Sequence, residues 1–161
     1  MKTLILIRHA KSSWEMFLDD INRPLELRGV SDANLVAASS TDFVPQNFQI
    51  VSSVAKRAVD TAMIFARHFS YPVNDISFQS DLYTFDGAKL EEIVKSFPNL
   101  HDNVILFGHN EAITNFVNKF GDVSIDNVPT SGFVLIRFNT DNWKTITSGK
   151  TLKTIFPKDL K

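Results

Sequence analysis

Four consecutive apolar residues, Leu4 to Ile7, stand near the start of the chain and would form a strand without a polar face. A strand of this kind lies in the centre of a sheet that helices cover on both sides. The run ends abruptly at Arg8 and His9. Because α/β sheets bind ligands beyond the carboxyl ends of their strands, both side chains are candidate site residues. The alternative is a strand that merely ends in surface charge, so partners elsewhere in the chain must decide.

Strand-like and helix-like patterns alternate along most of the chain. Apolar runs occupy residues 49–52, 76–78, 104–107, 133–138 and 143–147, and helical apolar spacing occurs at 30–37, 58–69, 90–97 and 113–120. This alternation predicts a largely parallel sheet with helices on both faces. Only residues 139–142 separate the last two runs, a length that suits a hairpin. We therefore predict a three-layer α/β/α sandwich whose mixed, mostly parallel sheet has an antiparallel edge strand.

Length and composition limit the classes of protein that fit. The 161 residues are 43% hydrophobic and contain no linker or repeat, which predicts one domain over residues 1–161. A net charge of -1 gives no overall attraction to nucleic acid or acidic membranes, so we expect neither as a partner. Without cysteine, disulfides, thiolate metal sites and a cysteine nucleophile are excluded. The first apolar run is too short for a signal peptide or membrane span, which predicts a soluble cytoplasmic protein.

Two further strand ends carry groups that could join Arg8 and His9. After the run at 49–52, Ser52 or Ser53 is a candidate helix N-cap, which would place Arg57 in the first helical turn. An arginine there opposes the helix dipole unless an anion lies nearby, although a solvent-facing arginine is the simpler alternative. The third strand end reads Gly-His-Asn at 108–110, where the glycine permits a sharp turn and leaves His109 at the same edge.

These strand ends would bring together two arginines and two histidines: Arg8, His9, Arg57 and His109. Such a set suits a tetrahedral oxyanion, because arginine supplies forked donors to phosphate oxygens. Zinc is the competing interpretation, but its sites normally include a third histidine or a carboxylate, and two arginines would repel the ion. His68 and His101, in a late helical turn and a polar loop, are predicted to lie on the surface. We therefore predict a site for phosphate or a related oxyanion and no metal.

Four ordered motifs contain these residues. They are Arg8-His9-Ala10-Lys11, then Arg23-Pro24-Leu25 with Gly29, then Ser52-Ser53 with Arg57-Ala58 and Thr61-Ala62, and finally Gly108-His109-Asn110. In residue type and order they resemble the histidine phosphatase superfamily, also called phosphoglycerate-mutase-like. The short length and the Arg-His-Ala-Lys opening resemble its small bacterial branch, the SixA-type phosphohistidine phosphatases. The resemblance extends from Lys2 to the tail at 157–160.

The resemblance implies a role for each matched residue. His9 would be the nucleophile that forms a phosphohistidine intermediate, while Arg8, Arg57 and His109 would hold the phosphoryl oxygens, without a cofactor. The segment around Ser131 resembles a family stretch that brings a backbone amide to the phosphate, so Ser131 is a further phosphate-binding candidate. Neutral imidazole is a good nucleophile near neutral pH, and fixed positive donors stabilise the equatorial oxygens during in-line transfer, which agrees with these roles.

The sequence offers no clear general acid. Many family members use a carboxylate before the third main helix, where residues 81–87 provide Asp86 as the candidate; the other acids considered are Glu15, Asp19, Asp20 and Glu111. An alkoxide leaving group needs a proton, whereas the imidazole of phosphohistidine leaves more easily. The lack of a clear acid therefore favours phosphohistidine over an alkyl phosphate.

We predict a metal-independent hydrolase that removes phosphate from a phosphorylated protein, for example a histidine phosphotransfer domain. The alternatives are a phosphatase for small phosphate esters or anhydrides with the same chemistry, and a non-catalytic phosphate-binding regulatory module. Residues 12–22 and 79–87 are too short for a closed helical lid, so we expect an open groove. Trp14, Met16 and Phe17 would either form an apolar contact surface beside it or anchor their loop to the core.

Overall fold

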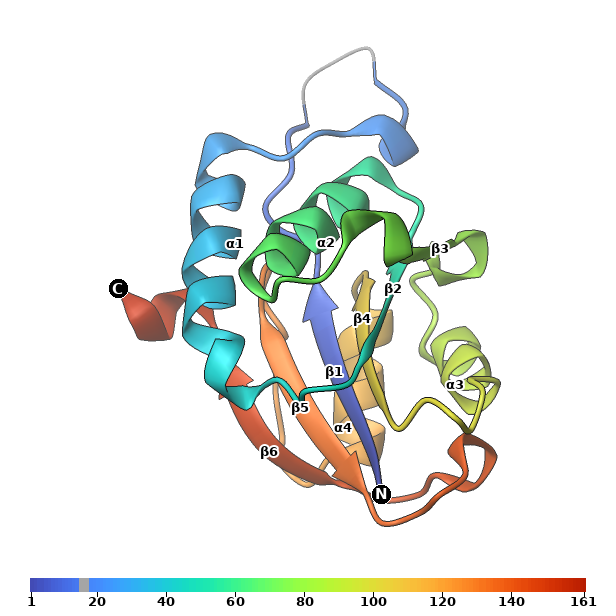
Figure 1. Ribbon diagram of the computed structural model, residues 1–161. Helices are drawn as coiled ribbons and strands as arrows, with labels where there is room; N and C mark the ends of the chain where they lie inside the picture. The colour runs from blue at the N-terminus through green and yellow to red at the C-terminus, as the bar shows by residue number, and fades with distance from the viewer. Residues whose placement is uncertain (15–17) are drawn as a thin grey trace.

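A six-stranded mixed sheet forms the centre of the molecule (Figure 1), whose computed structural model describes residues 1–14 and 18–161. The strands are β1 (Lys2–Arg8), β2 (Gln49–Ser53), β3 (Ser77–Gln79), β4 (Asn103–Gly108), β5 (Phe133–Phe138) and β6 (Lys150–Ile155), in the order β3-β2-β4-β1-β5-β6. The first four in this order are parallel, β5 is antiparallel to β1, and β6 is antiparallel to β5. The predicted mixed sheet is confirmed.

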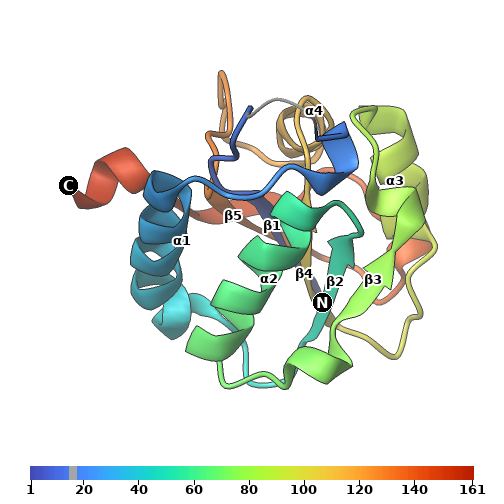
Figure 2. The ribbon, with the colours of Figure 1, turned by 90° about the horizontal axis from the view of Figure 1, so that it is seen from above.

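Helices cover both faces of this sheet, so the predicted three-layer arrangement is also confirmed. The α-helices are α1 (Leu27–Ser40), α2 (Lys56–His68), α3 (Gly87–Lys95) and α4 (Ala112–Phe120). Short 3-10 helices are η1 (Asp20–Asn22), η2 (Thr41–Phe43), η3 (Val73–Asp75), η4 (Ser80–Leu82), η5 (Trp143–Thr145) and η6 (Pro157–Leu160). Figure 2 shows α1 and α2 on one face of the sheet and α3 and α4 on the other.

The opening apolar run explains why β1 lies in the middle. Ile5 and Ile7 belong to the core cluster under α1 and α2, whereas Leu4 and Leu6 belong to the cluster under α3 and α4. Successive residues of a strand point to opposite faces of the sheet, and helices cover both faces. All four side chains are therefore buried. The carboxyl end of β1 is therefore held from both sides of the sheet.

A glycine in α1 fixes the segment that follows β1. A Cβ at Gly29 would stand 2.1 Å from the carbonyl oxygen of Lys11, so no other residue fits without displacing the backbone. The same carbonyl accepts a hydrogen bond from the amide of Glu26 at 2.9 Å, and Ser12 forms an isolated antiparallel bridge with Leu25. The start of α1 thus holds the chain just beyond His9.

The prediction of a strand at 143–147 is wrong. This segment begins with the 3-10 helix η5, and Trp143 is buried, with its indole nitrogen donating to the carbonyl of His101 at 2.7 Å. Trp143 and Ile146 are the buried residues here, and a spacing of three suits a helical turn rather than a strand. The partner of β5 is instead β6, an edge strand that carries polar residues such as Lys150 and Lys153 and so lacks an apolar run.

No helix in the described part of the chain is long and apolar enough to cross a membrane. The cytoplasmic location remains a prediction from the sequence, as does the assignment of residues 1–161 to one domain. Both core clusters nevertheless contain residues of β1 and β4, so the two halves of the core share the central strands.

Candidate active site

Two adjacent parallel strands bring the predicted histidines together. Arg8 of β1 pairs in register with Gly108 of β4, and the amide of His9 donates to the carbonyl of Gly108 at 3.0 Å. The next residue of each strand end is a histidine, and the ring centroids of His9 and His109 are 5.2 Å apart. The parallel register of the sheet therefore sets the position of both imidazoles.

Arg57 lies in the first turn of α2, as predicted, but it does not face solvent. Its side chain is 1% exposed, and it donates from Nη1 to the carbonyl of Asp20 at 2.7 Å and from Nη2 to Oδ2 of Asp20 at 3.0 Å. The predicted serine N-cap of α2 is wrong: Ala55 occupies that position, and Ser53 instead accepts a hydrogen bond from its amide at 3.2 Å. Arg57 is thus a buried cation held by the loop that follows β1.

A backbone contact determines which nitrogen of His9 is free. Nδ1 of His9 lies 2.8 Å from the carbonyl oxygen of Ala10. A carbonyl can only accept, so Nδ1 carries the proton and Nε2 of the neutral ring carries the lone pair. His9 is therefore oriented with an unprotonated Nε2, the form that a nucleophile needs.

Burial keeps both imidazoles neutral. It lowers the pKa of His9 to about 3, against the opposing bond to Ala10, and the positive charges of Arg57, Arg8 and Arg23 lower it further. Burial likewise lowers the pKa of His109 to about 3, together with the charges of His9 and Arg57. Near pH 7 the two rings are neutral beside cations, which is an environment that favours an anion.

Buried polar atoms without a partner mark the binding chemistry of the site. In the described part of the chain these atoms are Nε of Arg8, Nε of Arg57, Nδ1 of His109 and Oγ of Ser131. Nε2 of His109 forms a hydrogen bond with Oγ of Ser53 at 2.8 Å, and the direction of this bond sets whether Nδ1 carries the proton. Because an unsatisfied buried donor costs about 1–3 kcal/mol, these donors indicate a ligand that accepts several hydrogen bonds.

A pocket of about 270 Å³ opens at this edge of the sheet. Its walls contain three of the four predicted residues, Arg8, His9 and Arg57. His109 is buried and does not line the pocket; its ring is 5.4 Å from the rings of both Tyr83 and Phe85. The remaining lining residues are Lys11, Ser12, Trp14, Asp20, Arg23, Phe85, Asn110 and Thr130.

Among the described residues, Asp20 is the carboxylate that lines this pocket, and nothing in the sequence ranked it above the other candidate acids. Besides the contacts with Arg57, it accepts hydrogen bonds from Nε of Arg23 at 3.2 Å and from the hydroxyl group of Tyr83. Partial burial would raise the pKa of Asp20, but the hydrogen bonds from Tyr83 and Arg57 outweigh this and hold that pKa below its usual value. The sequence did contain an indication, because Arg23 and Arg57 need a nearby anion if their side chains are buried. The spacing of residues along the chain did not show that Asp20 would be this anion.

Asp86, the predicted general acid, lies elsewhere. It is the N-cap of α3, where its carboxylate accepts a hydrogen bond from the amide of Ala88 at 3.1 Å, and it does not line the pocket that contains His9. An aspartate just before a helix is a common N-cap, and this explains its position without a catalytic role.

Phosphate binding by Ser131 stays a prediction, but its own amide is already engaged in the structure. That amide donates to the carbonyls of Arg8 at 3.0 Å and His9 at 3.2 Å, with φ at 62°. It therefore fixes the end of β1 rather than facing a phosphate. The neighbouring Thr130 lines the pocket instead.

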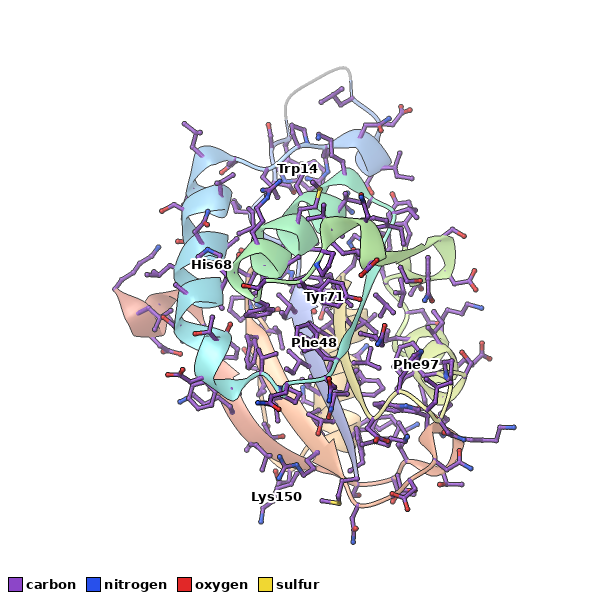
Figure 3. The ribbon with its side chains drawn as sticks, in the orientation of Figure 1. Trp14, Phe48, His68, Tyr71, Phe97 and Lys150 are labelled. Atoms are coloured by element: carbon purple, nitrogen blue, oxygen red, sulfur yellow. The ribbon has the colours of Figure 1, made fainter. Side chains whose placement is uncertain are left out.

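Trp14, which is labelled in Figure 3, comes from the segment after β1. It lines the pocket and is 75% exposed. Its ring lies 3.5 Å from the guanidinium carbon of Arg23, which is itself buried. The exposure of Trp14 favours the contact-surface interpretation, while the stacking on Arg23 fixes the position of the ring at the pocket wall. Met16 and Phe17 lie outside the described residues, as does Glu15.

The other two histidines do not join the site. His68 lies on α2 and contacts Oδ1 of Asn34 of α1 at 2.9 Å (Figure 3), and His101 precedes β4, where its carbonyl accepts from Trp143. Within residues 1–14 and 18–161, no group of three or more histidines and carboxylates could hold a metal. Metal independence remains a prediction.

Comparison with known proteins establishes the class of this protein. The family profile of the histidine phosphatase superfamily (branch 1) matches residues 4–123, so the chain belongs to that superfamily. An uncharacterized chloroplastic protein of Arabidopsis thaliana is 29% identical over 155 residues, which cover 89% of this chain and 69% of the relative.

Solved structures show the same fold at low identity. The protein histidine phosphatase SixA complexed with tungstate has a TM-score of 0.82 at 16% identity, over 99% of each chain. A phosphohistidine phosphatase SixA assigned in Agrobacterium tumefaciens has a TM-score of 0.77 at 20% identity, over 96% of this chain and 97% of its own. A mycobacterial glucosyl-3-phosphoglycerate phosphatase has a TM-score of 0.66 at 13% identity, over 94% and 97%. The predicted phosphoglycerate-mutase-like fold is confirmed.

Proposed function

We propose that this protein is a phosphatase that removes phosphate from phosphohistidine in another protein and carries the phosphoryl group on His9. The observation that carries the proposal is the neutral His9 with a free Nε2, in a pocket wall that also contains Arg8 and Arg57, with the ring of His109 5.2 Å away. Membership of the histidine phosphatase superfamily and the similarity in fold to SixA support the same chemistry.

In the first step, the Nε2 lone pair of His9 forms a bond to phosphorus while the P–N bond of the substrate breaks in line. The electron pair of that bond stays on the substrate nitrogen, and a substrate ring protonated on its other nitrogen leaves as neutral imidazole. Arg8 and Arg57 stabilise the charge on the phosphoryl oxygens as it passes between the two nitrogens. The Ala10 carbonyl keeps the proton on Nδ1, so phosphorylated His9 is cationic and activated for the next step.

In the second step, water attacks phosphorus and the P–Nε2 bond breaks, with its electron pair returning to His9. The proton of the attacking water passes to bulk solvent, and inorganic phosphate leaves the pocket. His9 is then neutral again because its pKa is lowered to about 3. The same arginines serve both steps, since both pass through a similarly charged phosphoryl group.

We favour phosphohistidine over an alkyl phosphate as the substrate because the pocket offers no protonated general acid among the described residues. Of the described residues, Asp20 is the carboxylate in the pocket wall, and its ion pairs with Arg57 and Arg23 favour its deprotonated form. A deprotonated carboxylate cannot donate a proton to an alkoxide, whereas the imidazole of phosphohistidine needs no such donor. Small esters and anhydrides with good leaving groups remain the second candidate, because a pocket of about 270 Å³ admits a small phosphorylated molecule.

The experiment combines turnover and trapping. The His9→Ala variant should lose turnover almost completely and bind no acid-labile phosphate, while the wild type should form an acid-labile phosphoenzyme on His9 alone. Arg57→Ala should retain the phosphoenzyme but react about 10²-fold more slowly. His68→Ala is the matched control, because His68 lies on the α1–α2 surface. Near wild-type rates in His9→Ala would refute the proposal, and labelling without phosphate release would indicate a regulatory module.

Two subsidiary proposals concern the whole protein. We propose that catalysis needs no metal, so chelators should leave activity intact while tungstate and vanadate inhibit; stoichiometric zinc on His9 and His109 would contradict this. We also propose that residues 1–161 form one catalytic domain, supported by the two core clusters that share β1 and β4.

A further inference from the structure

A second, larger groove lies next to the candidate active site. It has a volume of about 810 Å³ and lies between the start of α1, the segment after α4 and the C-terminal helix η6, which packs beside α1 (Figures 1 and 2). Thr130 lines both this groove and the pocket of His9. The two spaces also meet at a hydrogen bond, because Asn110 of the pocket donates to Oδ1 of Asn127 of the groove at 2.8 Å.

The walls of the groove combine apolar and basic groups. Its apolar surface comes from residues such as Ile125, Pro129 and Phe156, and its cations are Arg28, Lys158 and Lys161. Of its two carboxylates, Asp32 is buried and already bound by Arg28 at 3.8 Å and Lys161 at 2.9 Å. Among the described residues, Lys158 has no ion-pair partner, so its charge is available to a ligand.

The charge of the combined surface is opposite to that of the chain. Counting described residues only, the pocket and the groove together carry seven cationic side chains, namely Arg8, Lys11, Arg23, Arg28, Arg57, Lys158 and Lys161, against three carboxylates, namely Asp20, Asp32 and Asp126. The whole chain has a net charge of -1. The positive charge gathered here would attract an anionic ligand longer than one phosphate.

We propose that this groove is a second substrate subsite, which binds an acidic segment of polypeptide next to the phosphohistidine that enters the pocket. The inference rests on the proposed function and adds the substrate class. The smaller pocket is large enough for a single phosphoryl group, so the groove, which is three times as large, would contact another part of the substrate. A polypeptide that continues past Thr130 would place carboxylates against Lys158 and Arg28 and apolar side chains against Phe156.

The test uses two synthetic phosphohistidine peptides that differ only in their flanking residues. One carries aspartate and glutamate on both sides of the phosphohistidine, and the other carries asparagine and glutamine at the same positions. The wild type should show a kcat/KM about three- to tenfold higher for the acidic peptide at low salt. At about 1 M ionic strength, where the Debye length is about 3 Å, the preference should almost disappear.

Charge-reversal variants locate the source of this preference. Lys158→Glu should abolish or reverse it, and the combined Lys158→Glu/Arg28→Gln variant should do so more strongly. Lys158→Gln, which only removes the charge, should give an intermediate preference and guards against a folding defect in the reversed variant. The matched control is Lys150→Glu, since Lys150 is exposed and lies at the opposite end of the molecule from Trp14 (Figure 3).

The outcomes separate the subsite from the proposed function. If neither peptide is hydrolysed and His9 is never phosphorylated, the proposed function is refuted, and the subsite that depends on it is refuted as well. If both peptides are hydrolysed equally, or if the preference for the acidic peptide survives in Lys158→Glu, the phosphatase remains and the subsite is refuted. A preference lost in Lys158→Glu and retained in Lys150→Glu establishes the subsite.

Discussion

The two buried neutral histidines should make the protein less stable as the pH falls from neutral to mildly acidic. An unfolded histidine has a pKa near 6.5, whereas burial lowers the pKa of His9 and of His109 to about 3. The unfolded state therefore binds more protons between these values, and stability that is complete above about pH 6.5 is lost as the pH decreases. At about 1.36 kcal/mol per pH unit, each ring lowers the free energy of unfolding by about 2 kcal/mol at pH 5. If the two rings titrated independently, the free energy of unfolding would fall by about 4 kcal/mol in total. This sum is an upper limit, because the rings are neighbours and the protonation of one affects the other.

Urea unfolding at about pH 7.5 and about pH 5, in buffers without phosphate or sulfate, measures this loss. The double variant His9→Gln/His109→Gln should lose little over the same range, since glutamine does not titrate. Asp20 and Glu91 have lowered pKa values, so their contribution is lost only at more acidic pH and does not enter this comparison. An equal loss in the wild type and the double variant would refute the reasoning about buried neutral rings.

Three further predictions concern the surroundings of the site. Trp14→Ala should lower turnover of a phosphorylated protein more than turnover of a small ester, because Trp14 is 75% exposed beside the pocket; steady-state kinetics on both substrates tests this, and equal losses would contradict it. Asp20→Asn should strengthen inhibition by tungstate about three- to tenfold, because it removes a negative charge that contacts Arg57; an unchanged inhibition constant would show that Asp20 does not compete with the oxyanion. Gly29→Ala should reduce the free energy of unfolding by about 1–3 kcal/mol, because its Cβ would stand 2.1 Å from the Lys11 carbonyl; a neutral result in urea unfolding would disprove the clash.

Prediction from the sequence succeeded where the local pattern alone determines the structure. The run Leu4 to Ile7 is apolar on both faces and lies between two strands, and Arg57 stands in a first helical turn as its position predicted. Prediction failed where tertiary contacts override the local pattern. Trp143 and Ile146 look like strand residues, yet the indole nitrogen of Trp143 binds the carbonyl of His101, which is distant in sequence.

The acidic residues illustrate a second limit. Asp86 directly precedes α3, and Asp20 is the first residue of η1, so both acids stand at the start of a short helix. Sequence spacing cannot tell a helix cap from a side chain that enters a pocket. The difference arises because α2 brings Arg57 against the loop after β1, and a buried arginine requires a carboxylate. Which carboxylate meets that need depends on how the loop folds over the sheet, and this is settled only in three dimensions.

The in-register pairing of β1 with β4 bears on how such enzymes can diversify. Backbone hydrogen bonds between neighbouring strands set the separation of His9 and His109, so it does not depend on the loops that carry Trp14, Asp20 and Phe85. Lineages could exchange those loops and acquire new substrates without rebuilding the phosphoryl chemistry. For an engineer, these segments are the region to randomise: a library confined to residues 18–22 and 79–86 would vary the walls of the pocket while nearly every member kept the pairing of β1 with β4.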